Sequence, residues 1–418
     1  MPRLKIAGPC RLQGEVSVQG AKNSALPLLA ASILCREECI LHNCPQLSDV
    51  RISTEILRKL GCRVLSERDT ICIDAREVSS FQIPDDLMRE MRSSIIFLGA
   101  ILGRTGCAVL GFPGGCELGP RPIDLHLEAL RKMGASIVED HGRLLCETPT
   151  GLHGAHIALS FPSVGATENV LLAASCAKGI TLLENAAHEP EICDLADFLN
   201  SCGAKIRGAG GSTIEIEGVE QLGGCEHWVI PDRIAAATFL AAGAATYSTI
   251  TLRNINPQHL TPIWPVFEEA GCNLTLFRDA AVLAPPKKLH RIKHIRTMPY
   301  PGFPTDAQAP LMAMTTQCQG TSMFVENIFE SRYKHVGELL RLGAHIRVDG
   351  RVAVVEGPSK LSGTTVEAAD LRGGAALVVA GLAAFGETIV EEIHHIDRGY
   401  EAIERTLGDL GAQIRRLP

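Results

Sequence analysis

One segment of the chain joins a cysteine to an arginine on a backbone suited to neither helix nor strand. It reads Gly111-Phe-Pro-Gly-Gly-Cys-Glu-Leu-Gly-Pro-Arg-Pro122, and seven of its twelve residues are glycine or proline. A cysteine in such a loop is accessible, and Arg121 favours the thiolate of Cys116 relative to the usual thiol pKa of about 8.5. Glu117 opposes that effect. Cys116 is thus a candidate reactive thiol, or else one of fifteen inert cysteines.

Charged and capping residues recur at the beginnings of apolar, helix-forming stretches. Capping alone explains an acidic residue or a serine at such a place, whereas a basic residue opposes the helix dipole and needs another reason, which a bound anion would supply. For Lys22 and Asn23, the local sequence favours a solvated lysine beside an asparagine cap over an anion site. The positions are Lys22 with Asn23, Arg92, Ser163, Arg233, Asp306 and Arg372.

Further charged residues are ambiguous when each is taken alone. Asp370 and Arg372 could form a local ion pair, which contributes little if it is exposed. Arg332 and Arg398 occupy equivalent loop positions one repeat apart, where a charged side chain is commonly just solvated. These residues become informative only together.

Several other kinds of site are not indicated. There is no Gly-x-x-x-x-Gly-Lys-Ser/Thr phosphate loop, and residues 208–211 are typical of a hairpin turn. His153 and His156 lack further ligands nearby. The cysteines are scattered, without a Cys-x-x-Cys pair or a Cys/His grouping at zinc spacing. We therefore expect neither a metal nor a cofactor.

The elements that must position these residues repeat six times. Each repeat has a helix-like stretch ending in Leu-Gly-Ala or a close variant, followed in the first five by a strand–turn–strand pattern. The glycines suit left-handed helix C-caps and lie 68 to 73 residues apart, at Gly61, Gly134, Gly203, Gly271, Gly343 and Gly411. The sixth repeat stops at AQIRRLP, so strands near residues 4–6 and 15–18 are expected to complete it.

A second helix in each repeat is apolar on all sides, as in IAAATFLAAGAA and GGAALVVAGLAA. Such helices are buried all round, so we expect them inside a ring of sheets with the amphipathic helices outside. Three repeats per half predict two similar α/β domains, and 418 residues fit two domains.

Composition narrows the class of protein. The net charge of −7 argues against a general nucleic-acid binder. No signal peptide is visible at the N-terminus, and apolar runs such as 375–385 are shorter than the ~20 residues that span a bilayer. The sequence predicts a soluble cytoplasmic protein with reduced cysteines.

At these residues the chain resembles the UDP-N-acetylglucosamine 1-carboxyvinyltransferase (enolpyruvyl transferase) family, nearly end to end. The matching motifs are GAKNSALPLLAA at 20–31, GGCELGPRPIDLH at 114–126, SVGATEN at 163–169, NAAHEPEI at 185–192, FPTDAQA at 303–309, DLRGGAALVVAG at 370–381 and HIDRGYE at 395–401.

The resemblance implies two inside-out α/β barrel domains of three repeated units each. The first would span 22–230 and carry the cysteine loop at 111–122; the second would combine 1–21 with 231–418, with the substrates in the cleft between them. The implied reaction moves the enolpyruvyl group of phosphoenolpyruvate to the 3-hydroxyl of UDP-N-acetylglucosamine, an early step of peptidoglycan synthesis. A monomer without a cofactor is implied.

The resemblance also implies roles for single residues. Cys116 would transfer a proton, form a covalent adduct with phosphoenolpyruvate and be alkylated by fosfomycin, and Asp306 would be the base for the sugar hydroxyl. Phosphoenolpyruvate would be held by Lys22, Arg92, Cys116, Arg121 and Arg398. The UDP-sugar would contact Asn23, Arg92, Arg121, Pro122, Ile123, Asp124, Leu125, Ser163, Val164, Gly165, Asp306 and Ile328, and the polar lining would include Arg332, Asp370 and Arg372.

One departure and two alternatives remain. Some family members carry a lysine two residues before Ser-Val-Gly, where this chain has Phe161-Pro162, so that phosphate contact is in doubt. The shikimate-pathway enolpyruvyl transferase shares the fold and the donor but would not be expected to carry the GGCELGPRPID loop. A non-catalytic nucleotide-sugar sensor is the second alternative, although mere binding does not need both Cys116 and Asp306.

Overall fold

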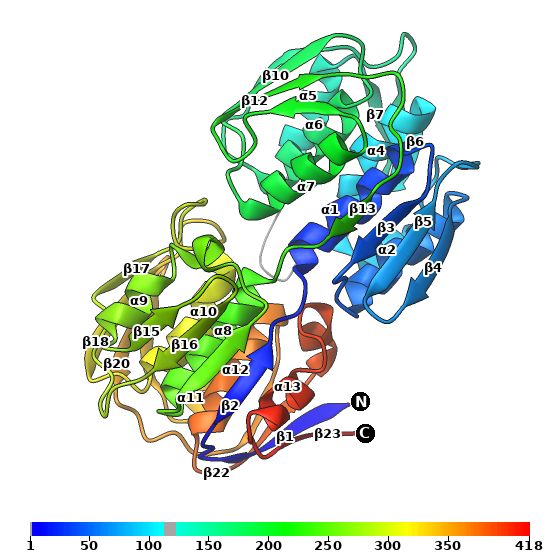
Figure 1. Ribbon diagram of the computed structural model, residues 1–418. Helices are drawn as coiled ribbons and strands as arrows, with labels where there is room; N and C mark the ends of the chain where they lie inside the picture. The colour runs from blue at the N-terminus through cyan, green and yellow to red at the C-terminus, as the bar shows by residue number, and fades with distance from the viewer. Residues whose placement is uncertain (1, 113–122) are drawn as a thin grey trace. The chain divides into compact units, whose positions relative to one another are not determined.

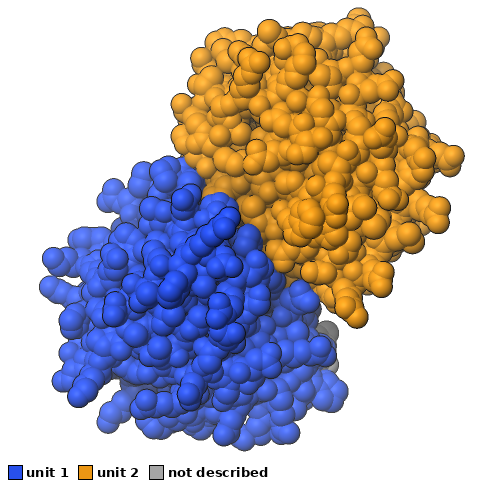
Figure 2. Space-filling model, viewed as in Figure 1, with its two compact units in different colours: residues 1–19, 117–119, 231–418 blue, residues 20–116, 120–230 orange. Residues whose placement is uncertain are grey.

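The computed structural model describes residues 2–112 and 123–418 and divides into two compact units (Figure 2). Of the described residues, 2–19 and 231–418 form unit 1, and 20–112 and 123–230 form unit 2. Each unit has a hydrophobic cluster built from its own residues. Of the helices in the described residues, none combines the length and hydropathy that a bilayer crossing requires.

Unit 1 places three apolar helices inside three four-stranded sheets. All thirteen residues of α8 are buried, and α8, α10 and α12 pack on one another within the ring of strands (Figure 1). A shorter helix follows each parallel pair of strands along the chain, namely α9, α11 and α13. The helices are α8 (Arg233–Ala245), α9 (Trp264–Glu269), α10 (Thr305–Thr315), α11 (Val336–Arg341), α12 (Leu371–Ala383) and α13 (Ile403–Asp409), with 3₁₀ segments η3 (Pro257–Leu260) and η4 (Ile393–Arg398).

The three sheets of unit 1 share one topology. A parallel pair is followed by two antiparallel pairs, in the orders β2-β14-β16-β15, β17-β18-β20-β19 and β21-β22-β1-β23. The strands are β1 (Arg3–Gly8), β2 (Gly14–Ser17), β14 (Ile250–Arg253), β15 (Asn273–Leu276), β16 (Ala280–Ala284), β17 (His294–Arg296), β18 (Gly320–Val325), β19 (His345–Asp349), β20 (Val352–Gly357), β21 (Thr365–Glu367), β22 (Gly386–Glu391) and β23 (Ile414–Leu417).

Unit 2 repeats this plan around α1, α4 and α6. Figure 1 shows these helices with α2, α5 and α7 and the three surrounding sheets. The helices are α1 (Lys22–Ala31), α2 (Ser48–Lys59), α3 (Asp85–Glu90), α4 (Phe97–Thr105), α5 (Asp124–Lys132), α6 (Val164–Ala174) and α7 (Pro190–Ser201), with 3₁₀ segments η1 (Ser32–Leu34) and η2 (Arg92–Ile96).

Two sheets of unit 2 have four strands, in the orders β13-β3-β5-β4 and β9-β10-β12-β11, and the third has the order β6-β8-β7. Beside β6, a single bridge between Gln82 and Val109 takes the place of a fourth strand in the described residues. The strands are β3 (Cys39–His42), β4 (Arg63–Glu67), β5 (Thr70–Asp74), β6 (Cys107–Gly111), β7 (Ser136–Asp140), β8 (Arg143–Glu147), β9 (His156–Ala158), β10 (Ile180–Glu184), β11 (Lys205–Arg207), β12 (Thr213–Glu217) and β13 (Glu226–Trp228).

The predicted repeat architecture is confirmed, with one correction. All six repeat glycines adopt φ between 87° and 102°, the left-handed conformation expected of helix C-caps. β1 lies between β22 and β23 and completes the sixth repeat, as expected. The expectation for residues 15–18 is wrong, because β2 pairs in parallel with β14 of another sheet. Sequence alternation identifies a strand but does not specify its partner.

Candidate active site

A group of charged side chains in unit 1 surrounds Asp306, in the first turn of α10. One carboxylate oxygen accepts a bond from the guanidinium of Arg332 at 2.9 Å, and the other accepts from Arg372 at 3.1 Å. Both arginines are 2% exposed, whereas the Asp306 side chain is 29% exposed. Asp306 is therefore oriented by two buried cations and still accessible to a ligand.

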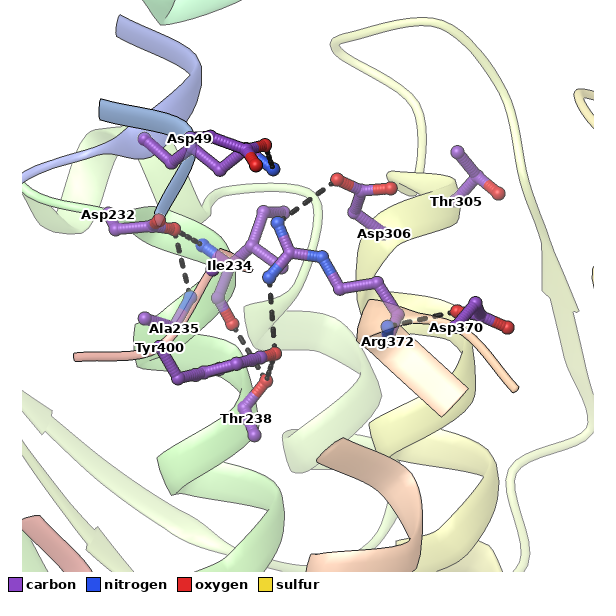
Figure 3. Close-up of polar contacts among 12 residues, drawn as sticks. Asp49, Asp232, Ile234, Ala235, Thr238, Thr305, Asp306, Asp370, Arg372 and Tyr400 are labelled. Carbon is purple, nitrogen blue, oxygen red and sulfur yellow. Dashed lines mark hydrogen bonds and ion pairs between the residues drawn. The ribbon is translucent and has the colours of Figure 1, made fainter. Parts of the chain in front are cut away.

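Arg372 has a second set of partners, which Figure 3 shows with Asp306 on the opposite side of its guanidinium. It donates to the Tyr400 hydroxyl at 3.2 Å, and that hydroxyl lies 2.8 Å from the hydroxyl of Thr238. Burial alone would lower the pKa of Arg372, but Tyr400 and the carboxylates of Asp306 and Asp232 raise it above its ordinary value. The cation is thus permanent at physiological pH.

Asp370 and Arg332 hold the surrounding backbone. Asp370 is the N-cap of α12, where its carboxylate accepts from the N–H groups of Arg372 and Gly373 at 2.9 Å each. Arg332 also donates to the carbonyl of Thr305 at 3.0 Å. The polar lining residues expected from sequence, Arg332, Asp370 and Arg372, thus lie around Asp306. The two arginines bond to Asp306 directly, and Asp370 caps the helix that carries Arg372.

Ile328 and Arg398 are the other predicted site residues of unit 1. The Ile328 N–H donates to Glu326 at 2.8 Å, and the same carboxylate group accepts from the Thr305 hydroxyl at 3.0 Å. This network ties the loop that carries Ile328 to the start of α10. Arg398 is half-buried at the end of η4, two residues before Tyr400.

Lys22 begins α1 in unit 2 and is mostly buried. Its ammonium lies 2.6 Å from a carboxylate oxygen of Asp49, which is fully buried in the first turn of α2. Asn23 is half-buried next to it. The ion pair with Asp49 therefore explains why a lysine stands at this helix start, in addition to the bound anion that the sequence suggests.

The two other UDP-sugar segments predicted in unit 2 meet at the starts of α5 and α6. Ser163 caps α6 by accepting from Ala166 N–H at 3.3 Å, and Val164 and Gly165 form its first turn. A Cβ on Gly165 would lie 2.9 Å from Cε1 of His126, so α5 can approach this closely only at a glycine. His126 follows directly after Ile123, Asp124 and Leu125.

His126 itself was not singled out in the sequence, although it ends the GGCELGPRPIDLH motif. It is buried and lies 2.9 Å from the side-chain amide nitrogen of Asn169 in α6. Burial lowers the pKa of His126 to about 4, so its ring is neutral at physiological pH. Tyr400 and Asp49 are also positioning residues that sequence reasoning missed, and Tyr400 lies within the quoted HIDRGYE motif.

Four predicted site residues remain, namely Arg92, Cys116, Arg121 and Pro122. Cys116, Arg121 and Pro122 lie outside the described residues. Arg92 begins η2, which leads into α4. The structure therefore brings together Asp306, Arg332, Asp370 and Arg372 in unit 1, and the 123–125 and 163–165 segments in unit 2.

Comparisons with known proteins agree over the full chain. The family described as EPSP synthase (3-phosphoshikimate 1-carboxyvinyltransferase) matches residues 6–407. UDP-N-acetylglucosamine 1-carboxyvinyltransferase 2 of Caldanaerobacter subterraneus subsp. tengcongensis is 49% identical over 417 residues, covering 100% of both chains. The UDP-N-acetylglucosamine 1-carboxyvinyltransferase of Psychrobacter arcticus is 46% identical over 419 residues, covering 100% of this chain and 99% of the relative.

Solved structures show the same fold. The enolpyruvyl transferase NikO from Streptomyces tendae has a TM-score of 0.91 at 26% identity, covering 100% of this chain and 99% of the other. EPSP synthase from Acinetobacter baumannii has a TM-score of 0.76 at 17% identity with 100% of both chains covered, a likeness of fold alone.

Proposed function

Because this chain belongs to the UDP-N-acetylglucosamine 1-carboxyvinyltransferase family, we propose that it transfers the enolpyruvyl group of phosphoenolpyruvate to the 3-hydroxyl of UDP-N-acetylglucosamine. Phosphate is released, and the product enters peptidoglycan synthesis. The observation that carries the proposal is identity of 46% to 49% with transferases of this name over the whole chain. The shikimate-pathway alternative has weaker support, since the EPSP synthase structure shares 17% identity.

In this proposal Asp306 is the base. A proton adds to the terminal carbon of phosphoenolpyruvate, the sugar oxygen bonds to the adjacent carbon, and the hydroxyl proton passes to the Asp306 carboxylate. The resulting tetrahedral ketal then loses phosphate and a carbon-bound proton, which restores the enol ether. Arg332 and Arg372 support this role because they orient the carboxylate before substrate binds.

Cys116 is the proposed proton donor and the site of the covalent adduct. Phosphoenolpyruvate would be held by four cationic residues, namely Lys22, Arg92, Arg121 and Arg398. The diphosphate sugar would be contacted by Asn23, Pro122, Ile328 and the segments 123–125 and 163–165. Two guanidiniums of fixed charge beside Asp306 and the buried Lys22 ammonium support an anion-binding role on a chain that is acidic overall.

The deciding experiment measures phosphate release from phosphoenolpyruvate with UDP-N-acetylglucosamine or shikimate 3-phosphate as the acceptor. We expect release only with the UDP-sugar, and loss of release in Cys116→Ala. Fosfomycin should label Cys116 faster when UDP-N-acetylglucosamine is present. Release with shikimate 3-phosphate would refute the acceptor, and UDP-sugar binding without release would favour a sensor.

Family membership also supports a monomeric, cytoplasmic protein. Light scattering coupled to gel filtration should give a mass of 44.8 kDa for a monomer.

A further inference from the structure

Four cysteines that are far apart in the sequence converge in unit 2. Cys35 follows η1, Cys39 begins β3, Cys202 is the C-cap of α7, and Cys225 precedes β13. The sulfur atoms of Cys35, Cys39 and Cys202 all lie within 4.8 Å of one another, and these three residues are buried. The Cys225 sulfur is 3.3 Å from that of Cys202 and is half-buried.

The backbone holds this arrangement through the segment 222–225. Cys35 forms a parallel bridge with Leu222, and the carbonyl of Cys202 accepts a hydrogen bond from Gly223 N–H at 2.8 Å. The carbonyl of Cys225 accepts from Ile40 N–H at 2.9 Å, in register with the parallel pairing of β13 and β3. One short segment is therefore bonded to each of the three other cysteine-bearing segments.

The cluster is distinct from the other buried thiols. Of the fourteen cysteines in residues 2–112 and 123–418, only Cys35, Cys39 and Cys202 belong to a group of potential metal ligands this close together.

The geometry suits a tetrahedral ion bound by sulfur. Zinc binds thiolates at about 2.3 Å, which separates the sulfurs of a tetrahedral site by roughly 3.8 Å. The limit of 4.8 Å among the sulfurs of Cys35, Cys39 and Cys202 admits this separation, and the Cys202–Cys225 distance of 3.3 Å is somewhat shorter. Cys35 and Cys39 are separated by three residues, a spacing found in zinc ligand pairs, so the expectation that no cysteines lie at zinc spacing is wrong for this pair. We propose that Cys35, Cys39, Cys202 and Cys225 bind a structural zinc ion.

The ion would act on the stability of unit 2, away from the proposed transfer site. The cluster follows the C-terminal end of α1, whereas Lys22 begins that helix. α1 has ten residues and rises about 15 Å. Binding would join the α1–β3 connection to the α7–β13 segment and would release the thiol protons to solvent. A soft, all-sulfur ligand set favours zinc over magnesium or calcium.

The test measures zinc in the full-length protein, purified without a histidine tag or chelator and under reducing conditions. We expect about one zinc per chain by plasma mass spectrometry. Cobalt added to the metal-free protein should produce the visible bands and sulfur charge-transfer absorption of a tetrahedral thiolate site. Cys39→Ser and Cys202→Ser should lose both signals. Cys62→Ser in unit 2 and Cys318→Ser in unit 1 should retain them as buried-thiol controls.

Three results would overturn the proposal. The first is wild-type protein that neither contains zinc nor binds cobalt in competition with a chelator, a measurement that requires no variant to fold. The second is unchanged metal content in folded Cys39→Ser. The third is a Cys202–Cys225 disulfide found by peptide mapping of protein alkylated at lysis, which would indicate a redox pair instead. None of these measurements depends on enolpyruvyl transfer activity.

Discussion

Single residues determine how charge is arranged in each unit. Asp306 is the partly exposed carboxylate between two buried guanidiniums, and Lys22 is the ammonium paired with a buried carboxylate. In both cases the residue proposed to meet substrate also balances charge inside the protein. Substitutions there will affect stability as well as chemistry, and experiments must separate the two.

Asp306→Asn is expected to lower kcat by about 10²- to 10⁴-fold, because the amide keeps the side chain's shape but cannot take the sugar proton. Removing the negative charge from beside Arg332 and Arg372 should also lower the free energy of unfolding by about 1–3 kcal/mol. Phosphate-release kinetics and urea unfolding measure the two effects. Asp85→Asn, which removes a surface pair with Arg143, is the control and should leave kcat unchanged. A wild-type kcat in Asp306→Asn would contradict the role of base.

Lys22→Met should lower the free energy of unfolding by about 3–5 kcal/mol, because it leaves the buried Asp49 carboxylate without its ammonium. The double variant Lys22→Met with Asp49→Asn should recover much of that loss, since the buried charge is gone. If Lys22 also binds phosphoenolpyruvate, KM for this substrate stays raised in the double variant. Recovery of KM together with stability would leave Lys22 only a structural role.

His126 predicts a pH dependence of stability. Its folded-state pKa of about 4 lies below the ordinary value of 6.5, so between these values the unfolded chain binds a proton that the folded chain does not. Stability should therefore fall as the pH drops from 6.5 to 4, by about 3 kcal/mol from this group. The fall measured by urea unfolding should be smaller in His126→Gln and unchanged in the exposed control His153→Gln. Equal falls in both variants would contradict the assignment.

Helices and their ends are the elements that the repeats specify. Gly203 ends α7 at φ 102°, and no atom lies within 4 Å of the point where a Cβ would stand, so a side chain there is opposed by backbone conformation alone. Gly337 lies inside α11 with equally open space and no positive φ. The two glycines form a matched pair.

Gly203→Ala should destabilise the protein by about 1–2 kcal/mol, because alanine disfavours the left-handed conformation. Gly337→Ala should be stabilising by about 0.4–1 kcal/mol, because it reduces the freedom of the unfolded chain. The denaturant midpoints of the two variants measure these effects, provided that the slope m of the unfolding free energy against denaturant is unchanged. Equal effects would mean that φ at Gly203 is not what constrains the position.

At the scale of the whole molecule, two units with separate cores should respond separately to local substitutions. The two tryptophans allow this to be measured, because Trp228 lies in β13 of unit 2 and Trp264 begins α9 of unit 1. Trp228→Phe and Trp264→Phe each leave a single tryptophan whose fluorescence follows the unfolding of one unit. In these proteins, Lys22→Met should lower the denaturant midpoint reported by Trp228 and leave the midpoint reported by Trp264 unchanged. Equal shifts of both midpoints would show one cooperative unit.

Much of the architecture could be predicted from local patterns. The six glycine caps, the apolar helices and the alternating strands each depend on neighbours in the sequence, and all are found in the structure. The basic helix starts at Lys22 and Arg372 are likewise visible as departures from capping rules. The roles proposed for these residues and for Asp306 came from resemblance, and those roles stay predictions.

Tertiary structure alone decided the partners. Asp49 beside Lys22, Tyr400 against Arg372 and β14 beside β2 come from distant parts of the chain, and nothing in their local sequence specifies the pairing. The four converging cysteines are the clearest case, since their sequence spacing as a set does not resemble a zinc motif. Local propensity determines which elements form, because it acts within a few residues. Which side chains meet depends on how the helices and strands pack together, and this packing is determined by the complete core of each unit.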